Sequence, residues 1–95
     1  MIQLVEVCQD RSSNSLKYNL REIFINPKHV VAVRPDERMS KMLNEGYLPE
    51  DIDKRQGFTK VYIDRGQSGI DITVVGDAGI ISQKLGIFEK NLLKG

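Results

Sequence analysis

The chain has 95 residues, of which 40% are hydrophobic and 28% are charged, which is typical of a globular protein rather than a disordered one. The 14 Lys and Arg against 13 Asp and Glu give a net charge of +1, which argues against a strong sequence-independent grip on nucleic acid. A single cysteine excludes an intrachain disulfide, and no run approaches the roughly 20 apolar residues of a membrane helix. Because the N-terminus also lacks the pattern of a signal peptide, we expect one cytoplasmic domain over residues 1–95 and no membrane association.

Three β-strands are expected in the first 35 residues. MIQLVEVC (1–8) is a first strand, and the polar segment QDRSSNS separates it from a longer strand in LKYNLREIFINP (16–27). That strand stops at Asn26-Pro27, because proline cannot donate to the ladder of a sheet. HVVAVRP (29–35) is predicted to be a short buried strand, since its valines are too β-branched to favour a helix.

A helix and a loop are predicted to form an insertion over about residues 36–57. Asp36 is a plausible N-cap, Met39, Met42 and Leu43 share one helical face, and Gly46 follows a helix expected from Glu37 to Glu45. The loop then runs to Gly57, with Leu48 and Ile52 packing inwards. The acidic residues of the helix and the loop are interpreted as a solvated face. They are Asp36, Glu37, Glu45, Glu50, Asp51 and Asp53.

The last part of the chain predicts a hairpin and a short helix. FTKVYID (58–64) and GIDITVVG (69–76) alternate in polarity and are joined by a glycine-containing link, the pattern of a β-hairpin. DAGIISQKLG (77–86) has Asp77 as a plausible N-cap and Gly86 as a stop, and the apolar tail IFEKNLLKG should pack on its own core or on a neighbouring subunit. The expected fold is therefore α+β and mainly β: an antiparallel sheet of about five strands, or a small barrel, with one inserted helix and a short C-terminal helix.

The link Gly66-Gln67-Ser68-Gly69 matches the GxxG of KH domains, but that motif lies between helices, whereas strands flank it here. The segment also lacks the Gly-Lys-Ser/Thr of a P-loop and the third glycine of a dinucleotide-binding fingerprint. We interpret it as a turn, with Arg65 and Gln67 as candidate ligand contacts at its tip.

No set of residues with catalytic or metal-binding spacing is visible in the sequence. His29 is the only histidine and has no partner pattern around it, so we interpret it as structural. Cys8 is expected to be a small core or edge residue, and the carboxylate pairs Glu50-Asp51 and Asp51-Asp53 do not fit an EF-hand. The sequence therefore predicts a protein that is not an enzyme and that needs no cofactor.

A small basic face is the one candidate binding surface. Arg21, Lys28 and Arg34 lie on or beside the second and third predicted strands, and pairing of these strands could place the three side chains on one face. Aromatic side chains could stack on a ligand there, but the chain has only six, and we expect Tyr18, Phe24 and Tyr62 to build the core instead.

Several short motifs occur in a familiar order: an N-terminal apolar strand, an INP element, a threonine-led strand, a glycine turn and a valine-rich strand before a helix. The residues that carry this order are Ile25-Asn26-Pro27, Val30, Val33, Thr59, Val61, Gly69 and Val74-Val75. In this order the chain resembles the small FlbD/SwrD-type β-proteins, including uncharacterised phage-encoded relatives, over roughly residues 1–7, 22–35 and 58–85. The insertion and the tail depart from the pattern. The resemblance implies a small β-domain and carries no residue-level activity.

The favoured hypothesis is a non-catalytic accessory protein of bacterial or phage type that binds a protein partner through the insertion, regarded as an appendage that the sheet does not need. The alternative is a β-module that binds a small ligand or nucleic acid through the basic face or the Arg65 turn; nucleic acid is not favoured. Self-association is a further hypothesis, because the apolar tail and open sheet edges need covering.

Overall fold

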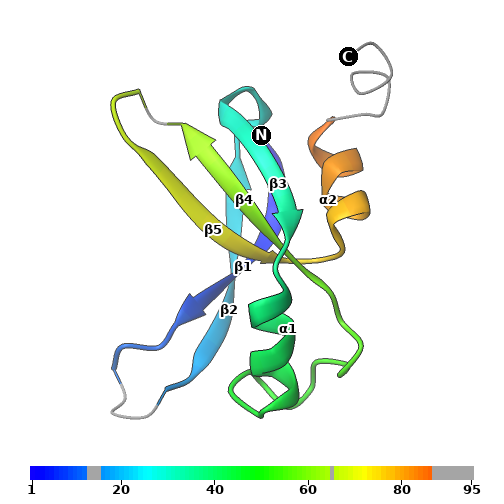
Figure 1. Ribbon diagram of the computed structural model, residues 1–95. Coiled ribbons are helices and arrows are strands. Elements are labelled where there is room, and N and C mark those ends of the chain that lie inside the picture. Colours follow the sequence, from blue (N-terminus) through cyan, green and yellow to red (C-terminus); the bar gives the residue numbers. More distant parts are fainter. Residues whose placement is uncertain (13–15, 65, 87–95) are drawn as a thin grey trace.

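The computed structural model describes residues 1–12, 16–64 and 66–86, which form five β-strands, two α-helices and one short 3₁₀ helix (Figure 1). In chain order these are β1 (Ile2–Gln9), β2 (Tyr18–Ile25), η1 (Pro27–His29), β3 (Val30–Pro35), α1 (Glu37–Asn44), β4 (Phe58–Asp64), β5 (Gly69–Val75) and α2 (Ala78–Leu85). All strand pairs are antiparallel, so the expected α+β fold with a five-stranded antiparallel sheet is confirmed.

The strand order in the sheet is β2-β1-β5-β4-β3, so the sheet is open, and of the two expected arrangements it is not the barrel. The β1–β2 hairpin forms one half, and β3, β4 and β5 form the other. The halves meet where β1 pairs with β5 through only two residue pairs, Glu6 with Val74 and Val7 with Thr73. Figure 1 shows the two halves crossing at this short contact, with α1 below it and α2 to one side.

Both helices form as predicted, although α1 ends at Asn44, one residue before the expected Glu45. The Asp36 carboxylate accepts a hydrogen bond from the Met39 N–H at 3.0 Å, and Gly46 adopts a φ of 89° just after α1. Asp77 occupies the N-cap position of α2 without a side-chain hydrogen bond to the helix, and Gly86 has the left-handed conformation (φ 77°). Positive φ values carry little cost at glycine, which explains why the helices stop there.

One hydrophobic cluster lies between the sheet and α2. Its buried members are Leu4, Ile25, Val61, Val74, Ile81 and Leu85. Gly76 lets the chain pass close to this cluster, because a Cβ there would lie 2.9 Å from the Ile81 Cδ1 atom. Its φ of 129° also lies in the region that favours glycine.

A second hydrophobic cluster is built largely from the insertion. Met39 and Leu43 of α1 and Leu48 of the following loop are buried with Val7 and Phe58. Ile52 packs against them, as expected. The prediction that the insertion is an appendage the sheet does not need is therefore wrong, because it supplies three of the five buried residues of this cluster.

β3 forms as predicted, but the prediction that it is buried is wrong. It is an end strand of the sheet, none of its residues is buried, and the Val31 side chain is 65% exposed. The register with β4 shifts between Val30 and Ala32, so Val31 lies at an irregularity that disrupts the free edge. A run of valines identifies a strand but does not reveal which neighbours cover it.

No described helix is long and apolar enough to cross a membrane. The apolar tail, residues 87–95, lies outside the described residues, so its expected packing stays a prediction.

Candidate functional site

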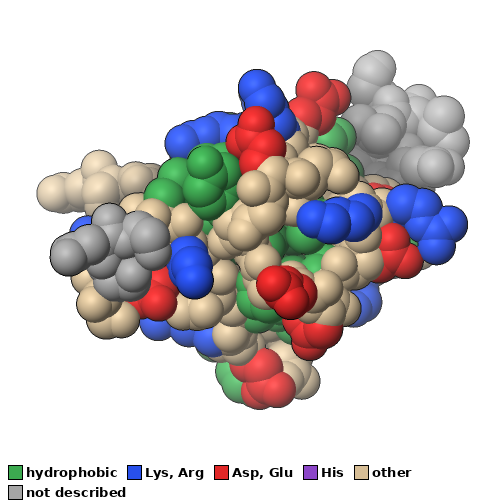
Figure 2. Space-filling view, turned by 90° about the horizontal axis from the view of Figure 1, so that it is seen from below, with side chains coloured by type: hydrophobic (Ala, Val, Ile, Leu, Met, Phe, Trp, Pro, Cys, Tyr) green, Lys and Arg blue, Asp and Glu red, His purple; other side chains and the backbone are tan. Residues whose placement is uncertain are grey.

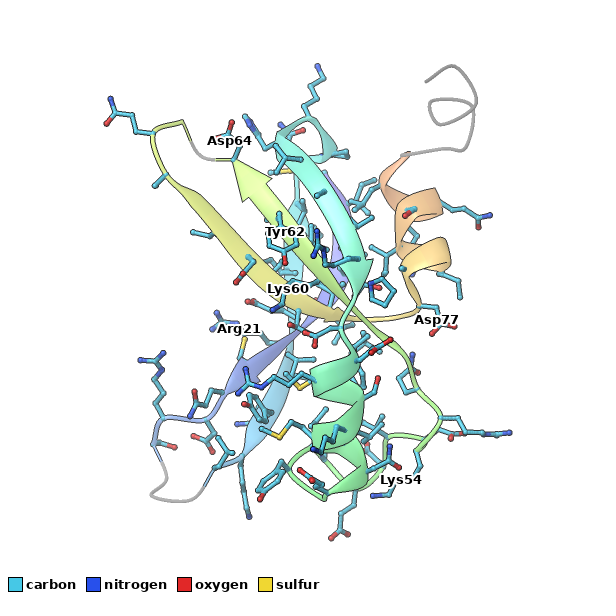
Figure 3. All side chains as sticks on the ribbon, in the orientation of Figure 1. Arg21, Lys54, Lys60, Tyr62, Asp64 and Asp77 are labelled. Carbon is cyan, nitrogen blue, oxygen red and sulfur yellow. The ribbon has the colours of Figure 1, made fainter. Side chains whose placement is uncertain are left out.

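A polar cavity of about 600 Å³ lies beside the crossing of the two halves of the sheet and next to the first turn of α1. Its walls come from β1, β2, α1, β4 and β5. The charged residues that line it are Glu6, Arg11, Arg21, Asp36, Arg38, Lys60 and Asp71. In Figure 3, Arg21 and Lys60 lie on the same side of the molecule, near the crossing.

Arg21 and Glu6 form an ion pair at the edge of this cavity. The two residues are opposite each other in the β1–β2 register, and the Arg21 Nε donates to the Glu6 Oε1 at 3.4 Å. The Glu6 side chain is 13% exposed, whereas that of Arg21 is 71% exposed. The Arg21 guanidinium also contacts the Cys8 thiol, and its remaining N–H groups can donate to a ligand.

Asp36 forms part of the cavity wall and has both carboxylate oxygens occupied. Oδ1 accepts the hydrogen bond from Met39 N–H, and Oδ2 accepts one from the Thr73 hydroxyl at 2.6 Å. The side chain thus fastens α1 to β5 while being largely buried. Because its oxygens are engaged within the protein, this carboxylate is a structural group of the cavity.

Three cations of the cavity, Arg11, Arg38 and Lys60, form no ion pair within the described part of the chain. Lys60 lies opposite Arg34 in the β3–β4 register. The Arg34 guanidinium in turn lies 5.5 Å from the centre of the Tyr62 ring, a cation–π contact. The cationic surface therefore continues from the cavity onto the neighbouring strand.

Cys8 also lines the cavity, and its surroundings disfavour the reactive thiolate. Partial burial is the main cause that raises the pKa of the thiol, and the nearby Glu6 carboxylate raises it further. The thiol is therefore a weak nucleophile at neutral pH, in line with the structural role expected for it.

We expect iodoacetamide to label Cys8 of the folded protein severalfold more slowly at pH 8 than it labels the same protein in urea, because the raised pKa leaves less thiolate. Mass spectrometry of the alkylated fraction over time measures both rates. Faster labelling of the folded chain would contradict this assignment.

The structure separates the sequence-predicted binding residues. Arg21 lines the cavity, Lys28 lies in η1, and Arg34 lies on β3. Because β2 and β3 are end strands on opposite edges of the sheet, the pairing that would have united these three residues is absent. Gln67 is exposed in the β4–β5 turn, and Arg65 lies outside the described residues, so a ligand role for this turn stays a prediction.

The acidic residues of the insertion do not gather into a metal site. Within residues 1–12, 16–64 and 66–86, no group of three or more His, Cys, Asp or Glu side chains could hold an ion. Asp53 accepts hydrogen bonds from Arg55, which lower the pKa of its carboxyl. Figure 2 shows acidic and basic side chains intermixed on this face of the molecule, in agreement with a solvated surface.

A second, mostly apolar groove of about 490 Å³ lies at the opposite end of the sheet. It opens between the end of β2 and the β4–β5 hairpin, where Figure 3 places Asp64. Its apolar lining residues are Met1, Ile23, Phe24, Ile25, Ile63 and Ile70. His29 lines the same groove from η1.

Phe24 is 59% exposed at this groove, so the expectation that it belongs to the core is wrong. Side chains alternate between the two faces of β2, so Phe24 shares a face with Tyr18 and Leu20. Those two side chains pack against the hydrophobic cluster built from the insertion, but Phe24 does not reach it. Among the described residues, Met1, Val31 and Ile80 are comparably exposed apolar side chains, and of these only Met1 lies in the groove.

The outer edge of β2 includes Phe24, whose side chain lines this groove. The Tyr18 N–H donates to the Tyr47 carbonyl and therefore points away from β1. Backbone N–H and C=O groups of every second residue in a strand point to the same side, so those of Leu20, Glu22 and Phe24 also point away from β1. Within the described residues, these three have no backbone partner on that side. A short open strand edge therefore ends at a residue that lines an apolar groove.

No family model matches this sequence, and neither the curated proteins nor the solved structures include a significantly similar chain. The resemblance to the FlbD/SwrD-type proteins accordingly stays a prediction.

Proposed function

We propose that the chain is a non-catalytic accessory protein of bacterial or phage type, acting in the cytoplasm, that binds an extended segment of a protein partner along β2. The proposal keeps the partner class expected from the sequence but moves the binding surface from the insertion to the apolar groove. A relationship to the FlbD/SwrD-type proteins is part of the same proposal.

The observation that carries this proposal is the exposed Phe24 in the groove. A large aromatic side chain at a concave apolar site is typical of binding surfaces, and its burial by a partner is worth roughly 1.5–3 kcal/mol. Ile70 and Met1 line the same groove and are also exposed.

The open edge of β2 indicates the shape of the partner segment. The outward N–H and C=O groups of Leu20, Glu22 and Phe24 can pair with a strand from another protein, which gives affinity through the main chain. Alternate side chains of that strand would then enter the groove, which gives specificity.

Charge argues against a second copy of this chain as the occupant. If the β2 strands of two copies pair antiparallel, a two-fold axis relates the copies. The residue on that axis then lies opposite the same residue of the other copy. Pairing centred on the open segment puts Glu22 opposite Glu22, and a shift by one residue toward Tyr18 puts Arg21 opposite Arg21. Like charges directly opposite are destabilising, so these two registers disfavour a second copy of the chain. The self-association hypothesis is less favoured for this edge.

The test uses the full chain as bait in a lysate of its source organism. We expect Phe24→Ser to weaken retention of a specific partner roughly 10- to 100-fold, as the loss of a buried aromatic predicts. Val31→Ser is the matched control, because Val31 is also an exposed apolar residue of an end strand but lies outside the groove. Hydrogen exchange of the purified complex should slow in residues 20–24.

Equal binding by the wild-type chain and Phe24→Ser would overturn the proposal, as would protection confined to the insertion or to β3. If a second copy of the chain slowed hydrogen exchange along β2, the occupant of this edge would be that copy and not a different protein.

A further inference from the structure

We infer that the polar cavity is a second binding site, separate from the groove, which takes a small ligand bearing two or more phosphate groups. The convergence of Arg21, Arg38 and Lys60 on one cavity carries this inference. The three come from β2, α1 and β4, and the fold alone brings them together.

The balance of charge in the cavity favours an anion once internal contacts are considered. Glu6 is paired with Arg21, and Asp36 is engaged by α1 and Thr73. Asp71 is then the one lining carboxylate without an ion pair or hydrogen bond in the described part of the chain. The cavity is lined by four cations and three carboxylates, so its formal charge is +1. Arg38 and Lys60 have no ion-pair partner in the described part of the chain, so their charges face the cavity unpaired.

Phosphate is the anion that best fits these donors. Guanidinium groups bind phosphate oxygens with two parallel hydrogen bonds, and lysine binds them as a compact charge. A volume of about 600 Å³ is in the range of small-molecule sites and exceeds the needs of one phosphate. The lining is largely polar, so the ligand should be hydrophilic as well as charged.

Arg34 extends the cationic surface beyond the residues that line the cavity. Its guanidinium lies over the Tyr62 ring, and it is opposite Lys60 in the β3–β4 register, so an elongated ligand bound at Lys60 could also contact Arg34. This arrangement favours a chain of phosphates over a single one.

Titration calorimetry with inorganic triphosphate, on the full chain in about 50 mM sodium chloride, tests the inference. We expect saturable binding of one triphosphate per chain, weaker binding of monophosphate, and a loss of affinity as salt is raised. Lys60→Glu and Arg38→Glu should each weaken triphosphate binding tenfold or more.

Two further variants make the test specific to the cavity. Lys28→Glu reverses the same charge in η1, outside the cavity, and should change the affinity less than threefold. Asp71→Asn removes the opposing carboxylate and should strengthen binding severalfold, a gain that a damaged fold would not produce.

Absence of saturable binding would overturn the inference, and so would an equal loss in Lys28→Glu and Lys60→Glu, which would indicate a general charge effect. Comparison with a nucleoside triphosphate shows whether a base adds affinity. A single-stranded oligonucleotide that binds more tightly than either triphosphate, with a steep salt dependence, would replace the proposed ligand by nucleic acid. Phe24 plays no part in triphosphate or oligonucleotide binding to the cavity. A failed test of the cavity therefore does not contradict the proposal that the apolar groove binds a protein partner.

Discussion

Replacing Phe58 with alanine should lower the free energy of unfolding by roughly 3–5 kcal/mol, a large part of the total stability of so small a domain. Phe58 is 2% exposed at the start of β4 and packs in the cluster formed with Met39, Leu43 and Leu48. Its removal leaves a cavity between the sheet and the insertion, which a chain of this size cannot readily close.

Phe24→Ala is the matched control for this measurement, because it deletes the same side chain from an exposed position. It should change the free energy of unfolding by about 0.5 kcal/mol or less. Urea denaturation followed by circular dichroism measures both values, and hydrogen exchange should show faster opening of α1 than of α2 in Phe58→Ala. Similar losses in the two variants would contradict the burial of Phe58.

The elements that sequence predicts well here are those that depend on local signals. The caps of α1 need only Asp36 and Gly46, which act within one turn of the helix. The β4–β5 hairpin needs two alternating runs and a glycine link, and the register pairs Phe58 with Val75 through Asp64 with Gly69. Such signals are readable because the interacting residues are close in the chain.

The features that sequence missed depend on contacts between distant segments. β2 and β3 are separated by only a few residues but lie on opposite edges, because β1 pairs with β5 on its other side. Strand periodicity states which residues share a face but not which strands are neighbours. This is why the exposure of Val31 and Phe24 differed from expectation.

The candidate cavity shows the same limit. Arg21 was identifiable as a basic residue on a strand, but its cavity neighbours Arg38 and Lys60 belong to α1 and β4. The one local signal was Lys60 itself, a charged residue within the predicted strand FTKVYID, on a face that also carries Tyr62. Charge on such a face indicates access to solvent, but only the crossing of the two halves reveals the concave surface.

Asp36→Ala should destabilise the protein by roughly 2–4 kcal/mol, because two different contacts are lost at one buried position. The carboxylate caps α1 through Met39 N–H and accepts a hydrogen bond from the Thr73 hydroxyl at 2.6 Å. The side chain thus joins α1 to β5 at the wall of the polar cavity, and the residue is only 8% exposed.

Two variants separate these contributions. Asp36→Asn keeps an oxygen for Met39 N–H and can still pair with the Thr73 hydroxyl, so it should lose less than half as much stability as Asp36→Ala. Thr73→Val removes only the contact to β5 and should cost about 1–3 kcal/mol. Chemical denaturation of all three variants provides the comparison, and an Asp36→Ala protein within about 0.5 kcal/mol of wild type would show that this carboxylate does not anchor α1.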